Sequence, residues 1–72
     1  MVNTKLLREK IDEHGFKMLF VAQKLGITYQ GLLNKMQNKS EFTASEIQIL
    51  TSLLNLTEKE RNKIFFAHKV EL

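Results

Sequence analysis

Apolar residues recur along the chain at the three- and four-residue spacing of helices, and no stretch alternates with the two-residue period of a strand. The first helical segment follows Asn3 and Thr4, either of which can supply an N-cap oxygen. Its apolar face carries Leu6, Leu7 and Ile11. Gly15 is placed to end this helix in the left-handed conformation, with His14 at the helix C-terminus. The pattern predicts an all-α fold.

Two further helices follow and are joined by a tight turn. The second is expected over about residues 17–25, and the chain turns at Gly26. Thr28 is a good N-cap for the third helix, which is expected to run to about Gln37. Residues 38–40 then form a polar loop.

The last two helices each begin with a capping box, a Thr followed three residues later by a Glu. Thr43 and Glu46 open the fourth helix, and Thr57 and Glu60 open a short fifth helix. Asn55 is expected to end the fourth. The apolar faces of these two helices carry Ile47, Leu50, Leu53, Leu54, Ile64 and Phe65. Residues 1–72 are therefore expected to form a single domain of about five helices.

Length and composition limit the chemistry that this chain can perform. A domain of 72 residues buries only about 60% of its unfolded surface, which leaves little room for a deep catalytic pocket. The chain has no cysteine, and its two histidines, His14 and His68, with scattered carboxylates do not make a metal site. It has neither a Gly-rich phosphate loop nor a convergent set of Ser, His and Asp. We therefore expect no enzymatic activity and no cofactor.

The chain is expected to be soluble and cytoplasmic. Its longest uninterrupted apolar run covers residues 18–22, whereas a membrane span needs roughly 20 apolar residues. The N-terminus lacks the apolar core of a signal peptide.

The segment around the predicted turn has the spacing of a helix-turn-helix. Two helices that cross at roughly a right angle need a small residue at their contact and a residue that tolerates positive φ at the turn. Ala22 meets the first need and Gly26 the second. The apolar residues that would bury one helix against the other are Val21, Leu25, Ile27 and Leu32. This motif indicates a domain that holds a helix against DNA.

The positive charge of the chain is confined to the same segment. The formal net charge is +3. Residues 14–40 carry four lysines and no acidic residue, whereas residues 1–13 are balanced and residues 41–72 are slightly acidic. A merely solvated face of lysines would normally include some acids, so the distribution favours a nucleic-acid partner.

Over residues 21–60 the sequence VAQKLGITYQGLLNKMQNKSEFTASEIQILTSLLNLTEKE resembles the Xre class of phage Cro and repressor-like helix-turn-helix domains. Within that class it is most similar to small stand-alone Cro-like regulators of Gram-positive phages and prophages. The resemblance implies a five-helix, lambda-repressor-like domain whose third helix enters the major groove of double-stranded DNA. It also implies sequence-specific operator binding, usually by a homodimer on a palindrome, and a role as a transcriptional repressor.

The resemblance also assigns roles to residues of this chain. Base reading falls to the start and outer face of the third helix, at Thr28, Tyr29, Gln30 and Asn34. The chemistry agrees, because Gln and Asn bond bidentately to adenine, while Thr and Tyr can reach a phosphate or a thymine methyl. Phosphate contacts are expected from Lys17, Lys35, Asn38 and Lys39.

Two residues of the third helix leave alternatives open. Tyr29 also lines up with the apolar Leu32 and Met36 and could pack in the core instead of contacting a base. Lys35 stands where the family usually has an apolar residue, with Met36 taking the packing role. The third helix could therefore be rotated slightly, which would turn Asn34 away from the bases.

The start of the second helix is unusually apolar. Residues 18–21 span most of its circumference, so either the core wraps further around this helix, or Leu19 and Phe20 form an exposed patch for a second subunit or a partner protein. Near the C-terminus, Phe66, Val70 and Leu72 are expected to contribute to a dimer contact. The alternative function is therefore an antirepressor-like protein-binding module that keeps the fold and uses the apolar start of the second helix.

Overall fold

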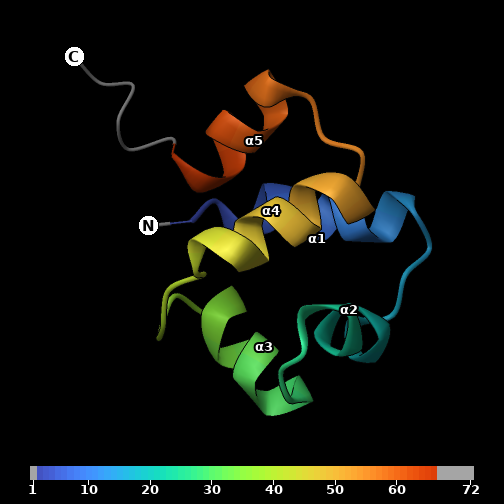
Figure 1. Ribbon diagram of the computed structural model, residues 1–72, viewed down its shortest axis with the longest axis vertical. Helices are drawn as coiled ribbons and strands as arrows, with labels where there is room; N and C mark the ends of the chain where they lie inside the picture. Colours follow the sequence, from blue (N-terminus) through green and yellow to red (C-terminus); the bar gives the residue numbers. More distant parts are fainter. Residues whose placement is uncertain (1, 67–72) are drawn as a thin grey trace.

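The computed structural model describes residues 2–66, and within them it contains five helices and no strand. The helices are α1 (Thr4–Glu13), α2 (Met18–Leu25), α3 (Tyr29–Met36), α4 (Ala44–Leu53) and α5 (Glu58–Phe65). The all-α expectation is therefore confirmed for the described part of the chain. In Figure 1, α2 and α3 form the lower end of the molecule and α5 the upper end, with α1 and α4 between them.

The start of α1 and the ends of α1 and α2 lie at residues that the sequence predicts. Asn3, and not Thr4, is the N-cap of α1, because its Oδ1 accepts a hydrogen bond from the Leu6 N–H at 3.1 Å. Gly15 and Gly26 follow α1 and α2 with φ of 72° and 73°, a conformation in which a Cβ is costly. The two chain reversals that bracket α2 are thus encoded locally.

Both predicted capping boxes are present. The Thr43 Oγ1 accepts from the Glu46 N–H at 3.1 Å, while the Glu46 Oε1 accepts from the Thr43 N–H at 2.9 Å. Thr57 and Glu60 form the same pair of bonds at the start of α5. Asn55, with φ of 52°, is left-handed directly after the C-cap of α4, as expected for the residue that ends this helix.

The core is apolar and receives side chains from all five helices. Its fully buried members include Leu7, Ile11, Val21, Ala22, Leu32, Leu50 and Ile64. Phe42, in the loop before α4, packs edge-on against Phe65 of α5 with 5.7 Å between ring centroids. Within residues 2–66 no helix is long and apolar enough to cross a membrane.

α1 and α5 pack together although they are far apart in the sequence. The Asn3 N–H donates to the Ile64 carbonyl at 2.7 Å, and the Lys10 ammonium donates to the Glu60 carboxylate at 2.7 Å. The hydrogen bond from Lys10, together with the bond that Glu60 accepts from the Thr57 N–H, lowers the pKa of Glu60 to about 2, and the bond to Glu60 raises the pKa of Lys10. These contacts join the first and last helices.

α2 and α3 meet at the three-residue turn 26–28 and bury the residues that the sequence assigned to their contact. Val21, Ala22, Leu25 and Leu32 are buried, and Ile27 is half-buried against the core. The Ile27 N–H donates to the Ala22 carbonyl at 3.1 Å and closes the end of α2. The turn therefore fixes how α3 is presented relative to α2.

Candidate nucleic-acid interface

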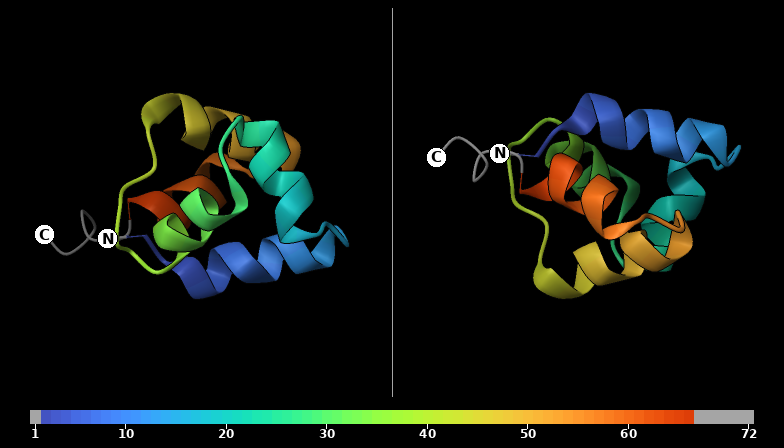
Figure 2. Two further views of the ribbon diagram at one scale, coloured as in Figure 1. Left: turned by 90° about the horizontal axis from the view of Figure 1, so that it is seen from below. Right: turned by 90° about the horizontal axis from the view of Figure 1, so that it is seen from above.

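The four residues expected to read bases lie at the start and along the outer side of α3. We call them the α3 outer stripe: Thr28, Tyr29, Gln30 and Asn34. The first three are exposed, and Asn34 is half-buried. Thr28 is the N-cap, and its Oγ1 accepts from the Gly31 N–H at 2.9 Å, which leaves the hydroxyl hydrogen free to donate. The left view of Figure 2 looks onto α2 and α3, with α1 and α4 on either side of them.

Tyr29 lies outside the core, so the alternative that it packs there is wrong. Its side chain is 47% exposed, whereas Leu32 on the same helix is fully buried. Tyr29 is the first residue of α3, and helical side chains lean toward the helix N-terminus. A position in the first turn is therefore consistent with an exposed ring, although Leu32 three residues later is buried.

Gln30 and Asn34 are linked to each other one helical turn apart. The Gln30 Nε2 donates to the Asn34 Oδ1 at 3.1 Å. This bond orders both amides and leaves the Gln30 Oε1 and the Asn34 Nδ2 unused by it. Met36 packs against the core, as the sequence predicted. The pair therefore presents an acceptor and a donor group close together on α3.

Two of the lysines expected to contact phosphate are exposed near the ends of this region. Lys17 occupies the N-cap position of α2 without a capping hydrogen bond from its side chain. Lys39 lies in the loop after α3. Asn38, between α3 and Lys39, has φ of 60°, and its side chain is bonded to the N-terminal segment, since its Oδ1 accepts from the Val2 N–H at 3.1 Å. Lys17 and Lys39 are thus available to a ligand.

Lys35 is engaged inside the protein. Its Nζ lies 3.1 Å from the Glu46 Oε1 and donates to the Glu41 carbonyl at 2.7 Å. The two side chains of the ion pair are only 14% and 10% exposed. The geometry gives Lys35 a structural role in joining α3 to α4. Sequence reasoning identified Glu46 as a cap, but it could not show that Lys35 lies beside it.

The ion pair also determines the charge of this surface. Burial raises the pKa of the Glu46 carboxyl. The hydrogen bond from the Thr43 backbone and the contact with Lys35 lower it by more, so the pKa of Glu46 is below its ordinary value. Glu46 is thus anionic and balances Lys35. The remaining lysines of residues 14–40, Lys17, Lys24 and Lys39, are exposed and keep this region positive.

Two further basic residues, from α1, lie beside α3, and the sequence pattern did not single them out. Lys5 and Arg8 line a shallow hollow of about 300 Å³ together with Gln37 and its neighbours on α3. Arg8 also forms an exposed ion pair with Asp12 at 3.4 Å. Their places on α1 were readable from the sequence, but their nearness to α3 depends on the packing of the two helices.

The apolar start of α2 is divided between the core and the surface. Met18 and Val21 are buried, whereas Leu19 is 54% exposed and Phe20 is 36% exposed. The alternative in which the core wraps further around this helix is therefore wrong for these two residues, whose side chains are exposed. Phe66 is half-buried against the core. Val70 and Leu72, expected in a dimer contact, lie outside the described residues.

Within residues 2–66 there is no group of three His, Asp or Glu side chains that could hold a metal ion. The His14 Nε2 lies 2.9 Å from the Leu54 carbonyl oxygen, and an imidazole nitrogen can bond a carbonyl only by donating. This contact links the C-terminus of α1 to the C-terminus of α4. His68 lies outside the described part of the chain.

Comparison of the chain with protein-family models, with curated proteins and with solved structures found no match. The assignment of a function therefore rests on the residues and their geometry.

Proposed function

We propose that this chain is a sequence-specific regulator that binds double-stranded DNA, of the Xre or Cro-like helix-turn-helix class, and that it acts as a repressor. In this proposal α3 enters the major groove of the operator. The observation that carries the proposal is the α3 outer stripe, exposed at Thr28, Tyr29 and Gln30, which lies within a segment whose free charges are all positive.

The chemistry of the stripe suits base edges. An amide that donates to adenine N7 and accepts from adenine N6 reads that base in the major groove, and Gln30 and Asn34 are candidates for such contacts. Thr28 and Tyr29, at the exposed start of α3, can reach a phosphate or a thymine methyl. Such contacts would provide the sequence specificity.

Backbone contacts would come from cations around the stripe. Lys17 and Lys39 are exposed, whereas Asn38 is omitted because its side-chain amide is bonded to the backbone of Val2. Lys35 is omitted from this set because it is paired with Glu46. Phosphate contacts of this kind position a protein on the duplex and make its affinity depend on salt.

The direct test is selection of binding sites from a random duplex library, followed by affinity measurements on the selected sequence and a scrambled version at low and physiological salt. We expect the selected sequence to bind about a thousandfold more tightly than its scramble. The affinity should also fall steeply with salt. A palindromic site would indicate two copies on one operator. Equal binding of both duplexes, or no binding to either, would refute the proposal.

Gln30→Ala and Asn34→Ala should each lower affinity for the selected site by about 1–3 kcal/mol while leaving scrambled-site affinity nearly unchanged. The matched control is Gln48→Ala, which removes an exposed amide from α4 and should change neither affinity. Equal losses on the two duplexes would show that the amides do not read bases.

A further inference from the structure

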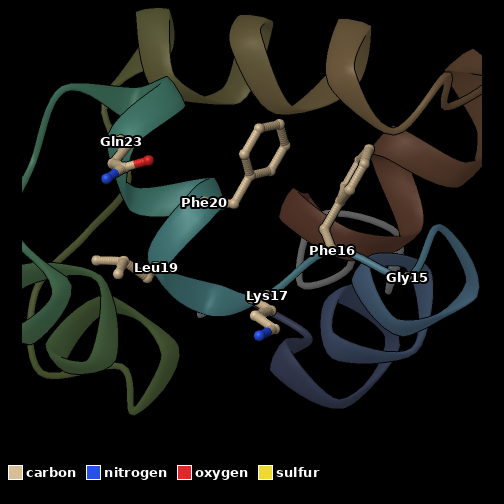
Figure 3. Close-up of a pocket in the computed structure, with 6 residues that line it drawn as sticks. All are labelled: Gly15, Phe16, Lys17, Leu19, Phe20 and Gln23. Carbon is tan, nitrogen blue, oxygen red and sulfur yellow. The ribbon is translucent and has the colours of Figure 1, made fainter.

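An apolar hollow lies beside the first turn of α2 on the surface of the molecule (Figure 3). It has a volume of about 440 Å³ and is open to solvent. We call it the α2 hollow, and its lining residues are Gly15, Phe16, Lys17, Leu19, Phe20 and Gln23. Leu19 and Phe20 are among the most exposed large apolar side chains of residues 2–66. Exposed apolar side chains beside an open hollow make this surface a candidate contact for another molecule.

Stacked side chains hold one wall of the hollow in place. Phe16 stacks on His14 with 5.3 Å between ring centroids, and Phe20 follows Phe16 at 5.0 Å. The Lys24 ammonium lies 5.4 Å from the centroid of the Phe20 ring. Figure 3 shows the two phenyl rings on the same side of α2, with Leu19 pointing away from them. Because the rings are already ordered, a partner would lose little affinity to their immobilisation.

The charged residue that lines the hollow and the one that stands over Phe20 are both lysines. Lys17 lines it and Lys24 stands over Phe20, and residues 14–40 contain no acidic side chain. A complementary partner must offer apolar side chains to Leu19 and Phe20 and carboxylates to the two lysines. We propose that the α2 hollow docks a segment of another protein in which one or two large apolar residues are flanked by Asp or Glu.

DNA is a poorer fit to this surface. Its phosphates would satisfy the lysines but would leave Leu19 and Phe20 facing a hydrated backbone. A single-stranded base needs a free aromatic face on which to stack, and Phe20 already contacts Lys24 and Phe16. This proposal therefore concerns a ligand other than DNA, although the two proposals share Lys17.

A second copy of the described chain also lacks the complementary surface. The exposed large apolar residues of residues 2–66 other than Leu19 and Phe20 are Tyr29 and Ile49. Tyr29 belongs to the acid-free segment, and the acidic residue on the helix of Ile49 is Glu46, which is paired with Lys35. Neither offers an exposed apolar side chain beside a free carboxylate on its own helix.

The test is selection from a display library of random peptides of about 16 residues, long enough for an amphipathic helix, followed by binding measurements with the full chain. Enriched peptides should combine large apolar residues with Asp or Glu. Leu19→Gln with Phe20→Gln should weaken binding about tenfold or more. Lys17→Gln with Lys24→Gln should weaken it and reduce its salt dependence. Ile49→Gln is the matched control, because Ile49 is 37% exposed on α4. This variant should bind the enriched peptides as tightly as the wild type.

Circular dichroism and thermal unfolding check each fold, and Leu19→Gln alone replaces the double variant if the latter is unfolded. The proposal is overturned if no peptide is enriched, if enriched peptides lack acidic residues, or if binding survives the changes at Leu19 and Phe20. A wild-type dimer in sedimentation that these changes abolish would also overturn it, because the occupant would then be a second copy. Gln30→Ala with Asn34→Ala should keep peptide binding, which separates this test from the test of DNA binding.

Discussion

At the residue scale, a lysine in a basic segment does not necessarily contribute to a binding surface. Lys35 and Lys39 lie four residues apart in the sequence, yet Lys39 is exposed whereas Lys35 contacts Glu46 and the Glu41 carbonyl. An ammonium held in this way is neutralised locally and has lost much of its hydration. Lys35 and Lys39 should therefore respond differently to substitution.

Lys35→Met should lower the free energy of unfolding by about 2 kcal/mol, because it leaves the Glu46 carboxylate without its cation in a nearly buried place. Chemical denaturation measures this loss. The salt dependence of DNA binding should not change. Lys39→Gln should leave the free energy of unfolding unchanged. It should reduce the slope of log affinity for DNA against log salt concentration by about 1. A reduced slope with normal stability for Lys35→Met would instead make Lys35 a phosphate contact.

At the scale of helices, the arrangement depends on how each helix ends and on how distant helices are joined. The left-handed Gly26 reverses the chain between α2 and α3, and the Lys10 to Glu60 contact joins α1 to α5. The first device is local, whereas the second connects residues fifty positions apart. Each can be tested by one substitution with a matched control.

Gly26→Ala should lower the free energy of unfolding by about 1 kcal/mol, because a Cβ is disfavoured at φ of 73°. No atom lies within 4 Å of the added Cβ, so the cost comes from the backbone alone. Gly26→Asn should cost less, since Asn tolerates the left-handed conformation. Equilibrium unfolding of both variants tests this, and an alanine variant as stable as the wild type would contradict it.

The Lys10 to Glu60 contact makes stability depend on acid pH. The pKa of Glu60 falls from 4.5 to about 2 on folding, so its contribution is present above 4.5 and is lost as the pH falls toward 2. Glu60→Gln can keep the capping bond to Thr57 but removes the charge. Its stability should therefore fall less steeply over this range, as measured by denaturation at several pH values.

Glu58→Gln, on the same turn of α5, is the control for that series. The Glu58 side chain is exposed and lies 3.9 Å from Arg61, so the variant should keep the wild-type pH dependence. If Glu58→Gln and Glu60→Gln flatten the profile equally, the Lys10 contact is not its source.

At the scale of the whole molecule, the two ends differ in the chemistry that they expose. The α2 and α3 end carries the acid-free segment, whereas α5 at the other end in Figure 1 mixes acids and bases. Lys5 and Arg8 of α1 extend the basic surface because α1 lies beside α3. Exposed basic residues occur on α5 as well. The contribution of Lys5 and Arg8 to DNA binding must therefore be compared with that of basic residues on α5.

Lys5→Gln with Arg8→Gln should weaken binding to specific and scrambled duplexes alike and reduce the salt slope by about 2, because phosphate contacts carry no sequence information. Lys59→Gln with Lys63→Gln removes the same charge from exposed positions on α5 and should have a much smaller effect. Titrations at several salt concentrations compare the two pairs. Equal effects would show that only net charge matters.

The sequence by itself determined the features that depend on neighbouring residues. Asn3, Thr43 and Thr57 cap their helices with bonds to N–H groups three residues away, and Gly26 takes a conformation that other residues avoid. Helical periodicity likewise indicated Leu32 and Leu50 as core residues. These features were predictable because each interaction spans only a few residues of one chain segment.

Only the tertiary structure decided which of several compatible environments a side chain occupies. Lys35 is paired because α4 brings Glu46 beside it, and Tyr29 is exposed although Leu32, three residues later on α3, is buried. Leu19 and Phe20 remain outside because Met18 and Val21 fill the side of α2 that faces the core. Periodicity defines the faces of a helix, but burial and charge pairing depend on which other helices pack against each face.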